Sequence, residues 1–286
     1  SSLVKNRLAV FSPSQVTYIT ETADWVINSI GMSLKTSLHD QRLTTYRITY
    51  SASDVDSPIV HFGSVHAFFK KNNWYKPQLN QQFVLSWFHV IPNDPRLFLI
   101  KEAQKDLHFI HTACQTTMHT LINAGVDESK IVVIPLGINL RIFTPVSKET
   151  KSRIRKTLQI PEHQIVIGSF QKDGVGWGEG NEPKLEKGPD VFVKTVIALK
   201  TLNPLVLLTG PARGYVKKAL EKEGIQYKHL YVKKYHHIAQ MYQALDVYII
   251  ASRIEGGPMA ILESMACGIP LVTTKVGMAI DMVNGQ

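Results

Sequence analysis

One stretch of the sequence decides the fold, Val247-Tyr-Ile-Ile-Ala-Ser-Arg-Ile-Glu255-Gly-Gly-Pro-Met-Ala-Ile-Leu-Glu263-Ser-Met-Ala-Cys-Gly268. Its first five residues form an apolar run typical of a buried strand, and a turn then leads into a short helical segment. Pro258 suits the start of that helix because it has no N–H to leave unpaired, and Gly268 suits its end. A strand that leads through a turn into a helix predicts a parallel α/β sheet.

The turn in this stretch has the features of a ligand site. It follows the carboxyl end of a strand, where open α/β sheets bind ligands. Gly256 and Gly257 let the backbone come close to a ligand, and the free N–H groups at the helix start favour a phosphate. Glu255 can face a ligand at the mouth of the helix, while Glu263, two turns inside, can accept hydrogen bonds from vicinal ribose hydroxyls.

The rest of the chain continues the same alternation of short β-branched or aromatic runs with longer amphipathic segments, which predicts βα units throughout. Helices are expected over Thr112–Ala124, which ends at Gly125, and after Gly188-Pro189-Asp190. The expected strands are Arg7–Phe11, Tyr46–Tyr50, Ile59–Phe62, Phe83–His89, Leu107–His111, Lys130–Pro135, Val166–Phe170, Leu205–Leu208, Leu230–Val232, Val247–Ala251 and Leu271–Thr273.

A polar, proline-containing segment around Pro145 separates two such series of βα units. We therefore expect two doubly wound Rossmann-like domains, residues 1–145 and 146–286, that face each other across a cleft. A length of 286 residues allows each domain a core of ordinary size. Because the second domain stops directly after a strand and a short turn of helix, it looks incomplete, and we expect the natural polypeptide to continue beyond Gln286.

The composition is that of a soluble globular protein, with 44% hydrophobic and 19% charged residues and no apolar run of membrane-spanning length. The two cysteines, Cys114 and Cys267, lie far apart, so we expect neither a disulfide framework nor a zinc site, and a cytoplasmic location fits best. The net charge of +9 suits a diphosphate ligand, an acidic membrane surface or nucleic acid. The basic residues are scattered, which argues against nucleic acid.

Around its two glutamates the sequence resembles glycosyltransferase family 4 of the GT-B fold. The donor site of that family carries an E-x7-E signature within S-x-x-E-G-x-G/P-x-x-x-L-E-A/S-M-A-C-G-x-P. A bare E-x7-E is more often a solvated helix, but the glycines and the strand–turn–helix setting favour the functional interpretation. The matching residues are Ser252, Glu255, Gly256, Glu263, Met265, Ala266, Cys267, Gly268 and Pro270.

Two further segments carry the resemblance. Residues 131–145 are similar to the family's V-I-P-N-G-V-D-x-x-x-F-x-P, with Leu136 in place of asparagine and Asn139 in place of aspartate. Lys187-Gly188 resembles the family's K-G, which puts an ammonium on the donor diphosphate. In much of the family an arginine precedes that lysine by four or five residues. Here the nearest basic residues are Lys184 and Lys172, and each is either the replacement or a solvated surface charge.

The predicted strand Phe83–His89 ends in a histidine at its carboxyl edge, which resembles the family position from which a histidine reaches the donor sugar. A lone histidine is more often structural, but its place at a strand end favours the functional interpretation. The family's glycine-rich loop after the first strand has no counterpart, because residues 11–22 contain no glycine pair. Ser12, Ser14 and Thr17 offer hydroxyls there, and no acceptor site is assigned to them.

The insertion Asp173-Gly-Val-Gly-Trp-Gly-Glu-Gly180 has enough glycine to form a mobile loop that closes on donor or acceptor. A plain surface hairpin explains it equally well. Asp54-Val-Asp56 is a D-x-D of the kind that binds a metal in the other large glycosyltransferase fold. It lies among turn-forming residues, however, and we interpret it as a solvated loop.

The resemblance implies a retaining hexosyltransferase that uses a nucleoside-diphosphate sugar, with a UDP-sugar favoured on family frequency. The acceptor would be a glycan, a lipid or a lipid-linked sugar in polysaccharide or glycoconjugate biosynthesis, and peripheral contact with the cytoplasmic face of a membrane is a further expectation. It implies catalytic roles for His89, Glu255 and Lys187. The donor would contact Lys172, Lys184, Lys187, Gly256, Gly257, Pro258, Met259, Ala260, Ile261 and Glu263.

No metal or other cofactor is expected, because a lysine and a helix N-terminus can balance the charge of the leaving diphosphate. Two alternatives share the fold class. A nicotinamide-dependent dehydrogenase is excluded, since no G-x-G-x-x-G follows an early strand with an acidic residue at the required distance. A non-catalytic nucleotide-sugar-binding relative stays open.

Overall fold

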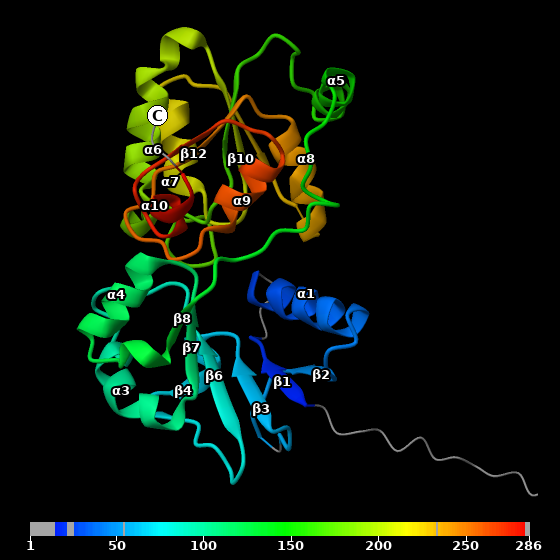
Figure 1. The fold of residues 1–286 in the computed structure, drawn as a ribbon. Helices are drawn as coiled ribbons and strands as arrows, with labels where there is room; N and C mark the ends of the chain where they lie inside the picture. Colours follow the sequence, from blue (N-terminus) through cyan, green and yellow to red (C-terminus); the bar gives the residue numbers. More distant parts are fainter. Residues whose placement is uncertain (1–14, 22–25, 54, 233, 284–286) are drawn as a thin grey trace, which may run out of the picture. The chain divides into compact units, whose positions relative to one another are not determined.

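The computed structural model describes residues 15–21, 26–53, 55–232 and 234–283 (Figure 1). The chain divides into two compact units. Unit 1 comprises Ser1–Trp87, Asn93–Thr112 and Leu121–Val132 as far as these are described, and unit 2 comprises Phe88–Pro92, Ala113–Thr120 and Val133–Gln286. Unit 2 thus takes two short segments from the first half of the sequence. The single boundary near Pro145 stays a prediction.

Unit 1 contains a sheet whose described strands have the order β2-β1-β3-β6-β7-β8, with parallel pairing from β2 to β7 (Figure 1). β4 and β5 form a small antiparallel pair. The strands are β1 Val16–Ile19, β2 Tyr46–Thr49, β3 Ile59–Phe62, β4 Phe69–Lys70, β5 Asn73–Trp74, β6 Gln82–Ser86, β7 Phe109–Thr112 and β8 Ile131–Val133. The helices are α1 Val26–Asp40, α2 Val65–Phe68, α3 Arg96–Ala103, η1 Gln104–Asp106, α4 Gln115–Asn123 and η2 Glu128–Lys130.

Tyr18 of β1 is fully buried in unit 1, and two glycines pack against its ring. A Cβ atom on Gly31 of α1 would lie 2.6 Å from the Tyr18 ring, and one on Gly63 would lie 2.2 Å from its hydroxyl oxygen. The hydroxyl donates a hydrogen bond to the carbonyl of Ile27 at 3.2 Å. The absence of side chains at Gly31 and Gly63 therefore lets the helix and the neighbouring strand close on this ring.

β1 differs from the first strand that the sequence predicts. The predicted strand Arg7–Phe11 lies outside the described residues, as do Ser12 and Ser14. Thr17 lies within β1 and is fully buried, and its hydroxyl is 2.6 Å from that of Ser57. Thr17 therefore serves the core of unit 1 and does not offer a free hydroxyl to an acceptor.

Unit 2 contains a parallel sheet whose described strands have the order β11-β10-β9-β12-β13. The strands are β9 Val166–Ser169, β10 Leu205–Thr209, β11 Tyr227–Leu230, β12 Val247–Ile250 and β13 Leu271–Thr273. The helices are α5 Lys148–Thr157, η3 Leu185–Lys187, α6 Pro189–Ala198, η4 Lys200–Leu202, α7 Gly214–Lys222, η5 Tyr235–His237, α8 Ile238–Gln243, α9 Met259–Ala266 and α10 Met278–Met282.

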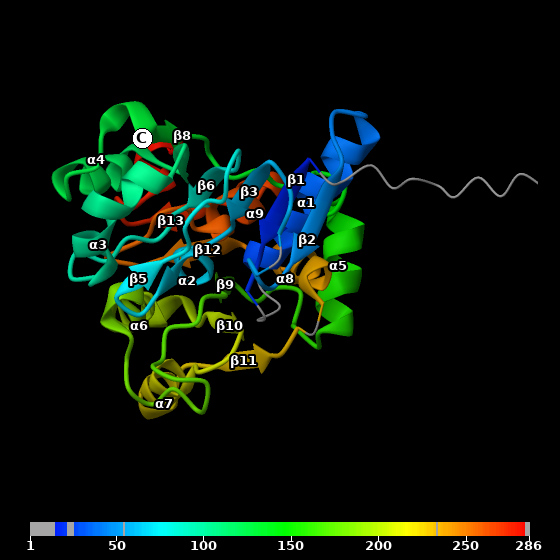
Figure 2. The same ribbon diagram turned by 90° about the horizontal axis from the view of Figure 1, so that it is seen from below.

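Helices cover both faces of the unit 2 sheet, as in a doubly wound fold (Figures 1 and 2). α6 and α7 contact each other and supply Phe192, Val196 and Leu220 to a cluster that includes Val206 and Leu208 of β10. On the other face α8 contacts α9, and buried aromatic rings fill the space beneath them. Among the described residues no helix is both long and apolar enough to cross a membrane.

Strand positions agree with the sequence where apolar runs are continuous. β3 and β13 have the predicted bounds, whereas β11 lies at Tyr227–Leu230 and not at Leu230–Val232. The residues Lys228 and His229 within β11 interrupt the apolar pattern, which explains the shift. β6 ends at Ser86, before the predicted end at His89, although the N–H of Trp87 still donates to the carbonyl of His111 in β7.

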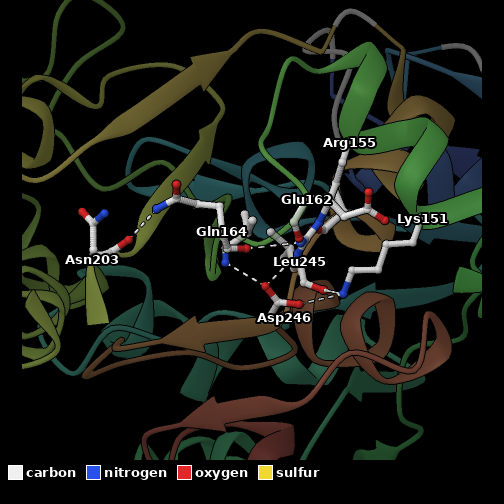
Figure 3. Close-up of polar contacts among 9 residues, drawn as sticks. Lys151, Arg155, Glu162, Gln164, Asn203, Leu245 and Asp246 are labelled. Carbon is white, nitrogen blue, oxygen red and sulfur yellow. Dashed lines mark hydrogen bonds and ion pairs between the residues drawn. The ribbon is translucent and has the colours of Figure 1, made fainter. Parts of the chain in front are cut away.

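An ionic network around Asp246 ties α5 to the sheet of unit 2 (Figure 3). One carboxylate oxygen of Asp246 accepts hydrogen bonds from Arg155 at 2.7 Å and from the N–H of Val166 at 2.8 Å, and the other accepts from Lys151 at 2.8 Å. Arg155 is buried and also donates to the carbonyls of Ala244 and Glu162. The network thus fixes the starts of β9 and β12 against α5.

We predict that Asp246→Asn destabilises the protein by roughly 1–3 kcal/mol at neutral pH, the cost of leaving buried donors without their partner. Burial acts to raise the pKa of Asp246, but the hydrogen bonds from Lys151, Val166 and Arg155 bring it below the ordinary value. Its stabilising effect is therefore present above the unfolded carboxyl pKa of about 3.9 and is lost as the pH falls through the lower folded pKa.

Urea unfolding of the two proteins from pH 7 down to pH 3 measures both effects, and the difference between wild type and Asp246→Asn should shrink in acid. Glu223→Gln is the matched control, because Glu223 pairs with Lys200 at 3.9 Å on the surface. Its effect should stay within about 0.5 kcal/mol. If the difference in unfolding free energy between wild type and Asp246→Asn stayed constant from pH 7 to pH 3, ionised Asp246 would not be the stabilising group.

Candidate functional site

The candidate site lies where the strand order of unit 2 reverses direction. β9 starts the sheet, β10 and β11 follow on one side, and β12 and β13 lie on the other. Loops that follow the carboxyl ends of β9 and β12 therefore diverge from a common point, the usual ligand position in such sheets. There the hydroxyl oxygen of Ser252 lies 3.2 Å from the side-chain oxygen of Gln171, and the Gln171 amide donates to the carbonyl of Lys187 at 2.7 Å.

Glu255 is the centre of the polar contacts at this point. One of its carboxylate oxygens accepts hydrogen bonds from the ammonium of Lys187 at 2.7 Å and from the hydroxyl of Ser252 at 2.8 Å. The other oxygen lies 3.8 Å from Nδ1 of His89, and only 8% of the Glu255 side chain is exposed. The structure thus brings His89, Lys187 and Glu255 together within unit 2.

The surroundings of His89 favour the neutral form of its ring. Burial lowers the pKa of His89 most strongly, and the charges of Lys187 and Lys184 lower it further, while Glu255 acts in the opposite direction. A neutral imidazole carries one donor and one acceptor nitrogen. His89 can therefore make hydrogen bonds to a bound group without adding a positive charge.

The glycines of the site are required by the packing of the chain itself. Gly188 has a φ of +63°, and a Cβ atom there would lie 1.8 Å from the carbonyl oxygen of Ala251. A Cβ atom on Gly256 would lie 1.2 Å from the carbonyl oxygen of Phe88, and one on Gly257 would lie 2.8 Å from Cβ of Ala113. The close approach that the sequence predicts at Gly256 and Gly257 is thus made by neighbouring segments of unit 2.

The start of α9 follows these glycines. No side chain caps the helix, whose N-cap residue is Pro258. Met259 and Ala260 are half-buried at its first turn, and Ile261 is buried in the core. The uncapped N–H groups of this turn are suited to an anion, as the sequence predicts, whereas the side chain of Ile261 packs inward.

Glu263 lies further along α9 and is 4% exposed. Its two carboxylate oxygens accept hydrogen bonds from the hydroxyls of Tyr235, at 2.5 Å, and Tyr242, at 2.6 Å. Burial raises the pKa of Glu263, and the two hydrogen bonds act to lower it. The sequence predicts Glu263 as a site residue but gives no sign of either tyrosine, because both lie far from it in the chain.

Lys172 and Lys184, the two candidates for the missing arginine, differ in position. The ammonium of Lys172 lies 4.0 Å from the ring centroid of Trp177. Burial lowers the pKa of Lys172, and the charge of Lys184 lowers it further. The charge of Lys184 also lowers the pKa of His89, and which of the two lysines takes the place of the arginine stays open.

The glycine-rich insertion forms a hairpin with an anchored base. The N–H of Lys184 donates to the carbonyl of Asp173, and Gly174 pairs with Pro183. Asp173 forms an ion pair at 2.9 Å with Arg213, and both side chains are fully buried. The segment has the form of a hairpin and carries Trp177 at 66% exposure, and its closure on a donor or acceptor stays a prediction.

The other polar residues that the sequence singles out lie in unit 1. Asp56 is exposed and lies 3.7 Å from Arg47 in unit 1. His61 and His111 of unit 1 both contact the hydroxyl of Ser86, and burial lowers the pKa of His61 to about 3. Within the described part of the chain, no group of three or more His, Cys, Asp or Glu side chains is placed to hold a metal ion.

Residues 183–285 match the model of the family described as glycosyl transferases group 1. The lipopolysaccharide core biosynthesis mannosyltransferase LpsB of Rhizobium meliloti (strain 1021) is 30% identical over 162 residues, which cover 54% of this chain and 43% of LpsB. A D-inositol 3-phosphate glycosyltransferase of Stackebrandtia nassauensis is 30% identical over 166 residues, which cover 53% of this chain and 34% of that protein.

The matched parts are therefore less than half of these two relatives. Among solved structures, Anabaena Alr3699/HepE in complex with UDP-glucose has a TM-score of 0.73 at 16% sequence identity, over 95% of this chain and 83% of that one. At this identity the likeness shows the fold alone. The matches confirm the resemblance to glycosyl transferases group 1, over residues 183–285, and the GT-B fold of the chain.

Proposed function

We propose that the protein is a retaining glycosyltransferase that moves a hexose from a nucleoside-diphosphate sugar, a UDP-sugar by preference, to a glycan or lipid-linked acceptor. The observation that carries the proposal is the contact of Glu255 with Lys187, Ser252 and His89 at the carboxyl ends of β9 and β12. The relatives support it, because two of them are named as a mannosyltransferase of lipopolysaccharide core biosynthesis and an inositol phosphate glycosyltransferase. A cytoplasmic location, at the membrane face or away from it, is part of the proposal.

In the proposed site the donor diphosphate lies against the uncapped start of α9 and Lys187, with Lys184 nearby. Each can stabilise negative charge, the helix through its N–H groups and the lysines through their ammonium groups. The diphosphate then competes with Glu255 for the ammonium of Lys187. Release of that ammonium frees Glu255 to accept hydrogen bonds from hydroxyls of the donor sugar.

The proposed reaction is a front-face substitution. The bond from the anomeric carbon to the acceptor oxygen forms on the face where the bond to the phosphate oxygen breaks, and the acceptor proton passes to the departing phosphate oxygen. Glu255 and the neutral ring of His89 hold the sugar while positive charge develops on it, and Lys187 stabilises the leaving diphosphate. Labelled nucleotide sugars and a panel of glycan and lipid-linked acceptors test for transfer, and binding without transfer would favour a non-catalytic relative.

The first prediction from the proposed function concerns Lys187. Lys187→Ala should weaken UDP binding by about tenfold or more, the worth of a hydrogen bond to a charged group, whereas Lys187→Arg should keep much of the affinity. Isothermal titration calorimetry with UDP measures both. Lys200→Ala, which removes an ammonium from a surface pair of the same unit, is the control and should bind as wild type does. Equal affinities for Lys187→Ala and wild type would exclude Lys187 from the donor site.

The second prediction concerns Glu255. Glu255→Gln should lower kcat by about 100-fold, as expected when a group that acts mainly in the transition state is neutralised. UDP binding should not weaken, because the change frees Lys187 from its partner. Steady-state kinetics and UDP titration of the same preparation separate the two effects. A loss of UDP affinity as large as the loss of kcat would place Glu255 at the nucleotide instead of at the sugar.

The third prediction concerns metal dependence and stereochemistry. Transfer should continue in excess EDTA, since lysine and the helix start supply the positive charge that a metal supplies elsewhere. Proton NMR of the product at early times should show the anomeric configuration of the donor. Turnover that stops in EDTA and returns with a divalent cation, or a product of inverted configuration, would refute this part of the mechanism.

A further inference from the structure

The carboxylate of Glu263 is closed off from solvent by two phenols. Only 4% of the residue is exposed, and each of its two oxygens accepts a hydrogen bond from a tyrosine, Tyr235 or Tyr242. A ligand hydroxyl therefore cannot reach Glu263 while both tyrosines keep these positions. If Glu263 binds a nucleoside, one of the two has to move.

The two tyrosines are held very differently. Tyr242 is fully buried in α8, and its ring packs against the rings of Phe170 and Tyr248 at centroid distances of 4.8 and 4.9 Å. Tyr235 is 40% exposed and belongs to η5, a helix of three residues. The centroid of the Tyr235 ring lies 5.6 Å from that of Phe143. Tyr235 is thus the partner of Glu263 that can leave.

We propose that Tyr235 is a specificity-determining residue of the nucleoside subsite, because its phenol holds the position on Glu263 that a ribose hydroxyl takes when a nucleoside diphosphate binds. The inference rests on the proposed function, since it assumes that such a ligand binds here. Binding exchanges one O–H donor for another on the same carboxylate oxygen. The buried carboxylate is never left without a partner, provided that the ligand carries the hydroxyl.

This exchange has a consequence for selectivity. A ligand without ribose hydroxyls cannot replace the phenol, and Tyr235 then stays over Glu263 or leaves a buried carboxylate oxygen unpaired. Sites that are built to bind a hydroxyl reject analogues without it more strongly than apolar pockets reject small changes of shape. Tyr235 also competes with the correct ligand, so the removal of its hydroxyl should favour binding.

Tyr235→Phe tests the exchange, because it removes the competing hydroxyl and keeps the ring against Phe143. UDP should bind Tyr235→Phe roughly three- to tenfold more tightly than wild type, since the lost hydrogen bond no longer opposes binding. The dissociation constants come from isothermal titration calorimetry. With 2′,3′-dideoxyuridine diphosphate, which lacks both ribose hydroxyls, the gain should disappear.

Tyr227→Phe is the matched control. The hydroxyl of Tyr227 donates to Glu221 at 2.5 Å on the exposed surface of the same unit, so its removal should leave UDP affinity unchanged. Equal or weaker UDP binding by Tyr235→Phe, or an equal gain for the dideoxy analogue, would overturn the inference while the proposed function stands. Failure of wild type to bind any nucleoside diphosphate would overturn the proposed function, and the inference with it. Tyr235→Leu, which also removes the hydroxyl, serves if Tyr235→Phe does not fold.

Discussion

The parallel pairing of β9 with β12 is the contact on which the candidate site depends. Ile167 and Gly168 of β9 lie beside Val247 and Tyr248 of β12, so the two strands end at the same edge of the sheet. Gly168 leaves room there for a core side chain, because a Cβ atom at position 168 would lie 2.2 Å from Cδ1 of Leu245. Every contact of Glu255 with the loop that follows β9 depends on this register.

Glu255 and Glu263 lie eight residues apart, and both side chains are largely buried. Burial of a carboxylate is unfavourable unless it has hydrogen-bond or ionic partners of its own. Glu255 is balanced by a positive charge, the ammonium of Lys187, whereas Glu263 is held by two neutral phenols. Burial raises the pKa of Glu263, and a carboxylate in that position gains more from further donors than one that is already paired with a cation. The two glutamates of the E-x7-E pattern thus have different chemistry, one in the turn before α9 and the other inside that helix.

Much of the site could be predicted from the sequence because it lies in one short stretch with a local pattern. The strand, the glycines, Pro258 and both glutamates follow each other within residues 247–268, and β12 and α9 form there. His89 and Lys187 could be named because each lies in a motif of the family. The contacts of Gln171, Tyr235 and Tyr242 could not be predicted, since they depend on how distant segments pack and leave no periodic signal in the chain.

The same distinction holds for the glycines and for the first strand. Gly256 could be recognised as a required glycine, but only the structure shows that the carbonyl of Phe88 takes the space of its missing side chain. β1 is four residues long and half of its residues are polar or aromatic, so its apolar pattern is weak until Tyr18 is seen buried. A sequence pattern can indicate that a position is constrained, but only the tertiary packing shows which neighbouring residues impose the constraint.

The backbone around Lys187 limits which parts of the site can rearrange. The N–H groups of Arg253 and Ile254 both donate to the carbonyl of Glu186, and Arg253 also pairs with Asp190 at 2.7 Å. The loops before α6 and before α9 are thus joined on both sides of the Lys187–Glu255 pair. A Cβ atom at Gly188, Gly256 or Gly257 would clash with a neighbouring segment, so the backbone of these loops is closely packed. If a ligand replaces a hydrogen-bond partner of Glu255 or Glu263, the movement therefore falls to side chains. The flexible stem of Lys187 and the half-exposed ring of Tyr235 are best able to move. In the proposed reaction the backbone would keep its position while the hydrogen bonds to Glu255 and Glu263 change, which is the preorganisation that a transfer reaction needs.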